Sequence, residues 1–262
     1  AKGNIGANKN ADLLDQISLQ SFLINIAEKN CGSIAVAYMN STISYGELNE
    51  KSNSVANWLL DKGIVSGDII GIICKSPINI IIILLAALKV EATFIILDDT
   101  LPQKRIGQVI ADCGISILIS DTNKTFIYRE CFQVADILQN SRCDFYPESM
   151  NNDTYAYIVY TSGTAGGPKG IRIKSKSLLN FILWRNDEYS ISNNDVILQT
   201  LTPSSFDGYL ISIFTAMICG ATLVCLEKEE RADFGRLEKI FCKYGITNMS
   251  TNPAFVASII AG

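Results

Sequence analysis

The sequence contains no histidine. That absence excludes Ser-His-Asp and Cys-His nucleophilic catalysis, histidine general bases and most catalytic zinc sites, because each of them needs an imidazole. Any chemistry that this chain performs must therefore use carboxylates, lysine, hydroxyl groups or backbone amides.

Charged residues are also scarce. They make up 18% of the 262 residues, below the roughly 25% that is usual for soluble domains, whereas hydrophobic residues make up 48%. The formal net charge is −4, and no run of lysine or arginine exceeds two residues. This composition excludes a disordered chain. The sequence also lacks the cluster of lysine and arginine residues that sequence-independent nucleic-acid binding requires.

The eight cysteines form no Cys-x-x-Cys pair, and most of them lie within apolar runs. A disulfide framework suits a short secreted chain, whereas this chain is long and begins with no signal peptide. We therefore expect free thiols that pack as small hydrophobic side chains, in a protein of the reducing cytoplasm.

No apolar run is long enough to cross a membrane. The unbroken run Ile80–Leu88 is bracketed by Asn79 and Lys89, whereas a spanning helix needs about 20 predominantly apolar residues. Ser76 and Pro77 are suited to the N-cap and first position of a helix. The segment is predicted to be a helix buried in a core, with no membrane partner.

Helical and strand patterns alternate along the chain after a leader or linker at residues 1–17. Ser44 and Glu47 form a capping-box pattern, and Gly63 and Gly114 are suited to helix ends. Strands separated by helices indicate βαβ units with mostly parallel sheets, and hence an α/β fold. Predicted strands are 69–74, 92–97, 115–120, 155–160, 196–200, 221–226 and 246–250; predicted helices are 44–63, 106–113, 177–189, 208–219, 234–243 and those starting at 77 and near 253.

The most informative segment is the glycine-rich loop from Thr161 to Gly170. Its glycines let backbone N–H groups turn toward an anion, and three hydroxyl groups and Lys169 add further donors, which suits a polyphosphate. A flexible linker has a similar composition but is not expected between two apolar strands. The loop is not a Walker motif, because Gly170 rather than serine or threonine follows Lys169.

Residues Tyr157 to Gly170 resemble the phosphate-loop motif of adenylate-forming enzymes, and most closely that of the amino-acid adenylation domains of nonribosomal peptide synthetases. Other stretches resemble the family's first, second and fourth motifs in the same order. The resemblance extends from about Ser18 to Gly262. These stretches are Ile43–Asn49, Leu88–Ile106, and Phe206-Asp207 with Gly220–Val224.

This resemblance implies a fold of two stacked α/β subdomains, the N-terminal core of an adenylate-forming enzyme. Residues 44–174 would form the first subdomain, and residues 18–43 plus 175–262 would contribute to the second. The chain would end before the small barrel and the mobile C-terminal domain. The family's adenine site, magnesium-binding glutamate, ribose-binding aspartate and catalytic lysine would therefore be missing, so that no catalytic residue lies within this fragment and the fragment alone is expected to be inactive.

The implied activity is ATP-dependent activation of an amino acid as an aminoacyl-adenylate, followed by loading onto a phosphopantetheinyl carrier protein beside neighbouring synthetase domains. ATP would bind with Mg²⁺ held beyond the chain end. The implied substrate residues are Phe206, Asp207, Gly208 and Ile211, with Asp207 holding the α-ammonium group. The implied ATP-phosphate residues are Thr161, Ser162, Gly163, Thr164, Gly166, Gly167 and Lys169.

Three alternatives stay open. The chain could belong to an acyl- or aryl-CoA ligase, or it could be a catalytically incompetent scaffold. Asp207 could also serve only as the N-cap of the following apolar helix, because aspartate is a preferred cap. The family pattern is also broken at Val90 and Glu91, where small residues are usual, and at Ser175, where many relatives have histidine.

Overall fold

The computed structural model describes residues 14, 16–122, 128, 130–140, 142–145, 153–161, 169–203, 207–227 and 230–261. The helices are α2 (Leu19–Lys29), α3 (Tyr45–Asp61), α4 (Pro77–Lys89), α5 (Gln103–Cys113), α6 (Val134–Asn140), α7 (Ser175–Glu188), α8 (Asp207–Cys219), α9 (Phe234–Tyr244), α10 (Pro253–Ala261) and the 3-10 turn η2 (Glu230–Ala232). The strands are β1 (Ile34–Tyr38), β2 (Ser41–Ser44), β3 (Ile69–Ile73), β4 (Thr93–Ile96), β5 (Ile117–Ser120), β6 (Cys131–Gln133), β7 (Tyr155–Thr161), β8 (Lys169–Lys174), β9 (Val196–Gln199), β10 (Thr222–Cys225) and β11 (Asn248–Ser250).

The described strands form two sheets. One has the strand order β6-β5-β3-β4-β7-β8 and the other β11-β9-β10-β1-β2. Neighbouring strands run parallel except at the two edges β1–β2 and β7–β8, which are antiparallel. The predicted α/β class with mostly parallel sheets is confirmed.

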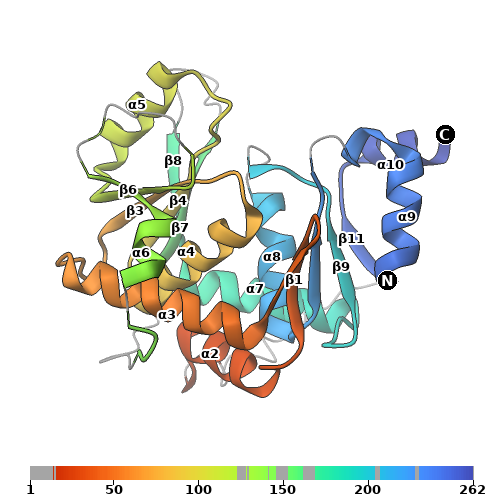
Figure 1. Ribbon diagram of the computed structural model, residues 1–262, viewed down its shortest axis with the longest axis horizontal. Coiled ribbons are helices and arrows are strands. Elements are labelled where there is room, and N and C mark those ends of the chain that lie inside the picture. The colour runs from red at the N-terminus through yellow and green to blue at the C-terminus, as the bar shows by residue number, and fades with distance from the viewer. Residues whose placement is uncertain are drawn as a thin grey trace, which may run out of the picture.

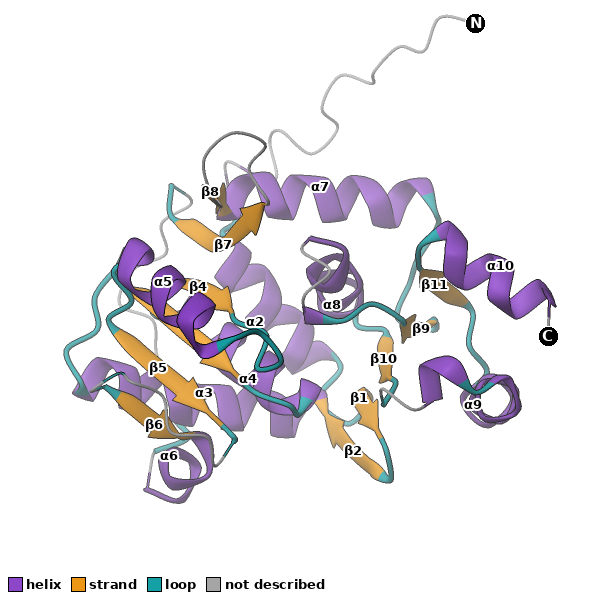
Figure 2. Cartoon of the chain, turned by 90° about the horizontal axis from the view of Figure 1, so that it is seen from above, coloured by secondary structure: helices purple, strands orange, loops and turns teal. Residues whose placement is uncertain are grey.

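Helices cover both faces of each sheet, because the central strands such as β3 are apolar on both faces. In β3, Ile70 and Ile72 point into the central core, whereas Ile69 and Ile73 join an outer cluster beneath α5. A third cluster joins the far face of the five-stranded sheet to Leu237 of α9. Figures 1 and 2 show the resulting layers, with α5 outside one sheet, α9 outside the other, and α4 and α8 between them.

Helix α4 is the predicted apolar helix, and it lies in the central core. Pro77 occupies its first turn, and the Ser76 side chain accepts a hydrogen bond from the Asn79 backbone at 3.4 Å. Its residues from Ile80 to Lys89 are all buried. Among the described residues, no helix combines the length and apolar character needed to cross a membrane.

The predicted helix ends also agree with the structure. Ser44 Oγ accepts from the Glu47 amide at 3.1 Å, while Glu47 Oε2 accepts from the Ser44 amide at 2.8 Å, so the capping box is complete. Gly114 ends α5 in the left-handed conformation at φ 65°. That conformation is costly for residues with a Cβ atom, which explains glycine at this position.

The cysteines only partly match the prediction. All eight are free thiols, as expected. Cys74 and Cys225 are buried, but Cys31, Cys143 and Cys242 are exposed rather than packed as small hydrophobic residues. The error arises because an apolar neighbour in sequence does not fix which face of a strand or helix the thiol occupies.

Lys89, the last residue of α4, is buried, although lysine is rarely so. Its ammonium group donates to four oxygen atoms of α3: Asn49 O at 3.2 Å, Asn49 Oδ1 at 2.7 Å, Ser52 Oγ at 2.7 Å and Asn53 Oδ1 at 2.6 Å. None of these partners is a carboxylate. Burial lowers the pKa of Lys89 to about 7.

Tyr45, the first residue of α3, joins the helical layer to the five-stranded sheet. Its buried hydroxyl group donates to Ala216 O at 3.0 Å and to Ala221 O at 2.7 Å, at the end of α8 and just before β10. Burial raises its pKa, so the hydroxyl group stays protonated and able to donate. This contact connects residues more than 170 positions apart.

The buried lysine predicts a pH-dependent stability. Folded Lys89 loses its proton near pH 7, whereas an unfolded lysine loses it near pH 10.4, so between these values the unfolded chain holds more protons. The free energy of unfolding of the wild type should therefore rise with pH relative to Lys89→Met, by up to about 1.4 kcal/mol per pH unit. Urea unfolding at several pH values from 7 to 9.5 measures this. Lys51→Met, at an exposed position, is the control, and its free energy of unfolding should change with pH as that of the wild type does. The prediction would be contradicted if the free energy of unfolding of Lys89→Met also changed with pH as that of the wild type does.

Tyr45→Phe should destabilise the fold by roughly 1–3 kcal/mol, because the variant leaves the buried Ala221 carbonyl group without its hydroxyl donor. Urea unfolding measures the loss. Tyr189→Phe is the matched control, since the Tyr189 side chain is exposed. Equal stability of the two variants would show that the Tyr45 hydroxyl group contributes nothing.

Candidate functional site

The glycine-rich loop connects two antiparallel neighbouring strands, β7 and β8. The register pairs Tyr160 with Gly170 and Thr161 with Lys169, so the two ends of the loop face each other across the hairpin. The predicted strand-to-strand connection is thus confirmed. The predicted phosphate-binding residues Ser162, Gly163, Thr164, Gly166 and Gly167 lie outside the described residues, as does the side chain of Thr161.

Lys169 is the predicted phosphate-binding residue whose side chain the structure describes. It begins β8, the edge strand of the six-stranded sheet, and it is exposed. Arg172 and Lys174 are exposed on the same strand, and Lys174 forms an ion pair with Asp153. Positive charge therefore collects along this edge although the chain as a whole is negative.

Helix α8 begins at Asp207, one residue before the predicted start. Phe206 and the Asp207 side chain lie outside the described residues. Gly208 and Ile211 are half-buried. A Cβ atom added to Gly208 would lie 2.5 Å from Leu201 Cδ1, so the absence of a side chain lets the preceding segment approach the helix closely.

Gln199 fixes the first turn of α8 against the end of β9. This buried side chain donates from Nε2 to Tyr209 O at 2.7 Å and accepts at Oε1 from the Leu201 amide at 3.3 Å. No sequence motif indicated this residue. The signal that could have revealed it is a polar residue at the carboxyl end of a buried strand, directly before a candidate binding segment.

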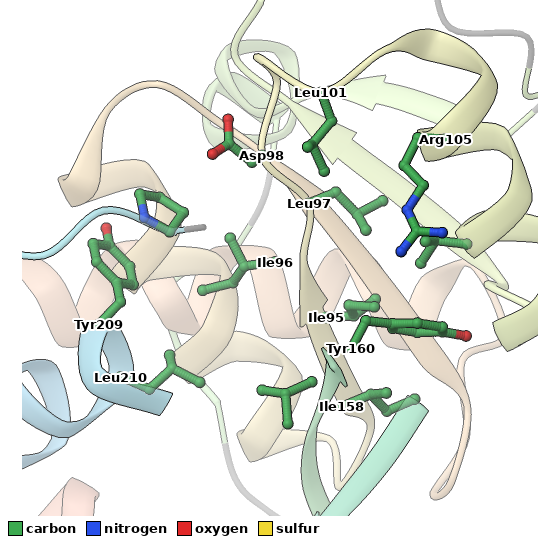
Figure 3. A pocket seen from close by; sticks show the side chains of 13 residues that line it. Ile95, Ile96, Leu97, Asp98, Leu101, Arg105, Ile158, Tyr160, Tyr209 and Leu210 are labelled. Atoms are coloured by element: carbon green, nitrogen blue, oxygen red, sulfur yellow. The ribbon is translucent and has the colours of Figure 1, made fainter. Parts of the chain in front are cut away.

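A cavity of about 200 Å³ lies between the last residues of β7 and the first turn of α8. Of the predicted site residues that the structure describes, Lys169, Gly208 and Ile211 do not line it. It is bounded by the carboxyl ends of β4 and β7, by α5 and by the start of α8, and crevices at the carboxyl ends of parallel strands are the usual ligand positions in α/β sheets. Figure 3 shows Tyr209 and Tyr160 on opposite sides of it, with Asp98 and Leu101 at its rim. The lining residues are Ile95, Ile96, Leu97, Asp98, Leu101, Arg105, Val109, Ile158, Val159, Tyr160, Pro203, Tyr209 and Leu210.

The cavity is mostly apolar, with polar groups at its edge. Asp98 accepts from the Thr100 amide at 2.9 Å and from Thr100 Oγ1 at 2.6 Å, which holds its carboxylate in place. Arg105 contributes a cation from α5. An apolar cavity with a few fixed polar groups can bind a small molecule in one orientation. Sequence analysis did not single out Asp98 or Arg105 as site residues, because the cavity is assembled from separate elements.

Comparison with curated proteins finds peptide synthetases. The chain is 29% identical over 262 residues to tyrocidine synthase 3 of Brevibacillus parabrevis, and the match covers 97% of this chain. The chain spans only 4% of the length of that relative.

Solved structures share the fold at lower identity. The nonribosomal peptide synthetase FmoA3, in an alpha-methyl-L-serine-AMP bound form, matches with a TM-score of 0.85 and 17% identity, over 94% of this chain and 28% of that one. O-succinylbenzoate coenzyme A synthetase of Bacillus subtilis, in complex with AMP, matches with a TM-score of 0.82 and 20% identity, over 92% and 63% of the two chains. Since both peptide synthetases and coenzyme A ligases adopt it, the fold does not distinguish their activities.

The family comparison extends over nearly the whole chain. The model of the AMP-binding enzymes matches residues 24–262, which include the β7–β8 hairpin, the cavity and the start of α8. The chain therefore belongs to the AMP-binding enzyme family.

Proposed function

We propose that this chain is part of an amino-acid adenylation domain, which activates an amino acid with ATP as an aminoacyl-adenylate. One observation carries the proposal: a single cavity touches both the end of β7, where the glycine-rich loop begins, and the first turn of α8, where Asp207 lies. The segments that flank the proposed phosphate-binding and substrate-binding residues, about 40 residues apart in the sequence, thus border one crevice, which supports a shared site.

ATP is the proposed nucleotide. The phosphates would be held by Lys169 and by backbone and hydroxyl donors of Thr161, Ser162, Gly163, Thr164, Gly166 and Gly167. The exposed start of β8 and its excess of positive charge support this role for Lys169, because charge-assisted hydrogen bonds to phosphate are the strong ones. Mg²⁺ is the proposed counter-ion of these phosphates, because it usually keeps several water molecules and binds through one or two carboxylates together with the phosphates.

An amino acid is the proposed second substrate, with Asp207 pairing with its ammonium group and Phe206, Gly208 and Ile211 beside it. The cavity beside Tyr209 and Leu210 supports a pocket near the first turn of α8, although Gly208 and Ile211 themselves do not line it. The FmoA3 structure, which shares the fold, holds alpha-methyl-L-serine-AMP, a compound of the proposed product class.

The proposed chemistry needs no nucleophilic side chain, in keeping with a sequence without histidine. A carboxylate oxygen of the amino acid attacks the α-phosphorus of ATP, and the bond to the β-phosphate oxygen breaks to release pyrophosphate. The protein contributes position and charge stabilisation. The thiol of a phosphopantetheinyl carrier protein then attacks the acyl carbon, and AMP leaves.

The organisation that we propose follows from the same assignment. Residues 44–174 would be one subdomain, and residues 18–43 with 175–262 would belong to the other. The carrier protein and neighbouring synthetase domains are the proposed partners, and the free thiols support a reducing, cytoplasmic location.

Exchange of labelled pyrophosphate into ATP by the full-length native protein tests the proposal against its two alternatives. Exchange that depends on an amino acid supports it. Exchange driven only by acids without an amino group would favour the coenzyme A ligase alternative, and no exchange with any acid would favour a non-catalytic scaffold.

Lys169→Ala in the full-length protein should reduce exchange at limiting ATP. Loss of one charge-assisted phosphate contact costs about 1.5–3 kcal/mol, which corresponds to about one to two orders of magnitude in rate. Lys174→Ala is the matched control, because it removes the same charge from the other end of β8. Equal rates for the two variants would remove Lys169 from phosphate binding.

Asp207→Asn separates the substrate anchor from a helix cap. Asparagine caps a helix about as well as aspartate but carries no charge, so a purely structural role predicts unchanged exchange. An anchor role predicts that the amino acid loses binding free energy on the order of 3 kcal/mol or more, because its ammonium group is left unpaired. Exchange by the variant with the corresponding 2-hydroxy acid should persist or rise. If the variant exchanges with the amino acid at the wild-type rate, Asp207 is not the anchor.

A further inference from the structure

The outer end of the β7–β8 hairpin has little sheet support. β8 is an edge strand, so β7 is its one neighbour. On its other side, β7 pairs with β4 through Phe94 and Tyr157, and the register extends no further toward the loop. Beyond the pairing within the hairpin itself, side-chain contacts are what can hold the last residues of β7 and the first residues of β8, including Lys169.

Tyr160 is the side chain in that position. It pairs with Gly170 across the hairpin, next to the pair formed by Thr161 and Lys169. A Cβ atom on Gly170 would lie 3.1–3.3 Å from the Tyr160 ring and hydroxyl oxygen. The ring therefore lies directly against the glycine backbone, in space that is open only because Gly170 has no side chain.

The Tyr160 hydroxyl group reaches a different element. It donates a hydrogen bond to the Asp112 carboxylate in the last turn of α5, and it lies 3.1 Å from Cys113 Sγ. Burial and the bond to Asp112 raise the pKa of Tyr160, so the hydroxyl group keeps the proton that it donates. Helix α5 is itself fixed, because Ile106, Val109 and Ile110 pack on the outer face of the sheet.

We propose that Tyr160 is a positioning residue for ATP, which fixes Lys169 at the hairpin end by clamping Gly170 with its ring and anchoring its hydroxyl group on Asp112. The inference rests on the proposed role of Lys169 in phosphate binding. Its physical reason is that a displacement of about 1 Å in a binding group can cost two orders of magnitude in rate. The clamp acts through Lys169, and Tyr160→Phe isolates it from the cavity wall that Tyr160 also forms, because the variant keeps the ring.

The test measures pyrophosphate exchange by the full-length protein with ATP and the amino acid varied separately. Tyr160→Phe keeps the ring but loses the bond to Asp112, and it should raise KM for ATP threefold to tenfold while KM for the amino acid changes less than twofold. Asp112→Ala should match it, and the double variant should be no worse than either single variant. Asp112→Asn should restore KM for ATP to within twofold, because its amide oxygen still accepts the hydroxyl hydrogen bond.

Tyr155→Phe is the matched control, since it removes a tyrosine hydroxyl group from the opposite end of β7, and its KM for ATP should equal that of the wild type. An unchanged KM for ATP in Tyr160→Phe, with an active wild type, would overturn the clamp alone. Equal increases in both KM values, together with a lower Tm, would show a merely structural role and would also overturn it. A wild type that exchanges with no acid would overturn the proposed function, and the clamp with it.

Discussion

The burial of α4 between the two sheets is the constraint on which the rest of the structure depends. Its residues from Ile80 to Lys89 are buried, so helices or strands must cover it on every side. It packs against β3 and β4, against β1 of the other sheet, and against α2 and α3. An apolar helix of this kind has no stable position at a surface, and two sheets with helices on both faces are the arrangement that buries it.

That arrangement also creates the site. Once α4 and α8 occupy the space between the sheets, the carboxyl ends of β4 and β7 meet the first turn of α8 at one edge. Gln199 secures α8 from the side of the five-stranded sheet, and the proposed Tyr160 clamp secures the hairpin from the side of α5. Lys169 at the start of β8 and the first turn of α8 thus lie on elements that other side chains hold, which favours precise positioning.

Much of this fold could be predicted because its signals are local. Hydrophobic periodicity, the capping box at Ser44 and the left-handed glycine at position 114 each act within a few residues. The helix α2 and the β1–β2 hairpin were not predicted, although Ser18 caps α2 by accepting from the Ser21 amide at 3.1 Å. Strand β2 is four residues long at a sheet edge, and it has too few residues for a clear alternating pattern.

The remaining features could not be predicted because they depend on residues brought together by folding. Tyr160 and Asp112 are 48 residues apart, and Lys89 meets its oxygen partners about 40 residues away. Glu91 stands where the family pattern has a small residue. Its φ is 58°, a left-handed conformation that favours glycine, so a residue with a side chain is unusual at this position. The loop residues 162–168 and Phe206 remain assigned by the family resemblance.

The transfer of oxygen from substrate to nucleotide tests the central claim most directly. The full-length protein would be supplied with ATP and an amino acid labelled with ¹⁸O in both carboxylate oxygens, and the products would be analysed by mass spectrometry. Attack of the carboxylate on the α-phosphorus, followed by cleavage at the acyl carbon, predicts one ¹⁸O atom in AMP and none in pyrophosphate. Label in inorganic phosphate, or AMP that carries no label, would contradict the account.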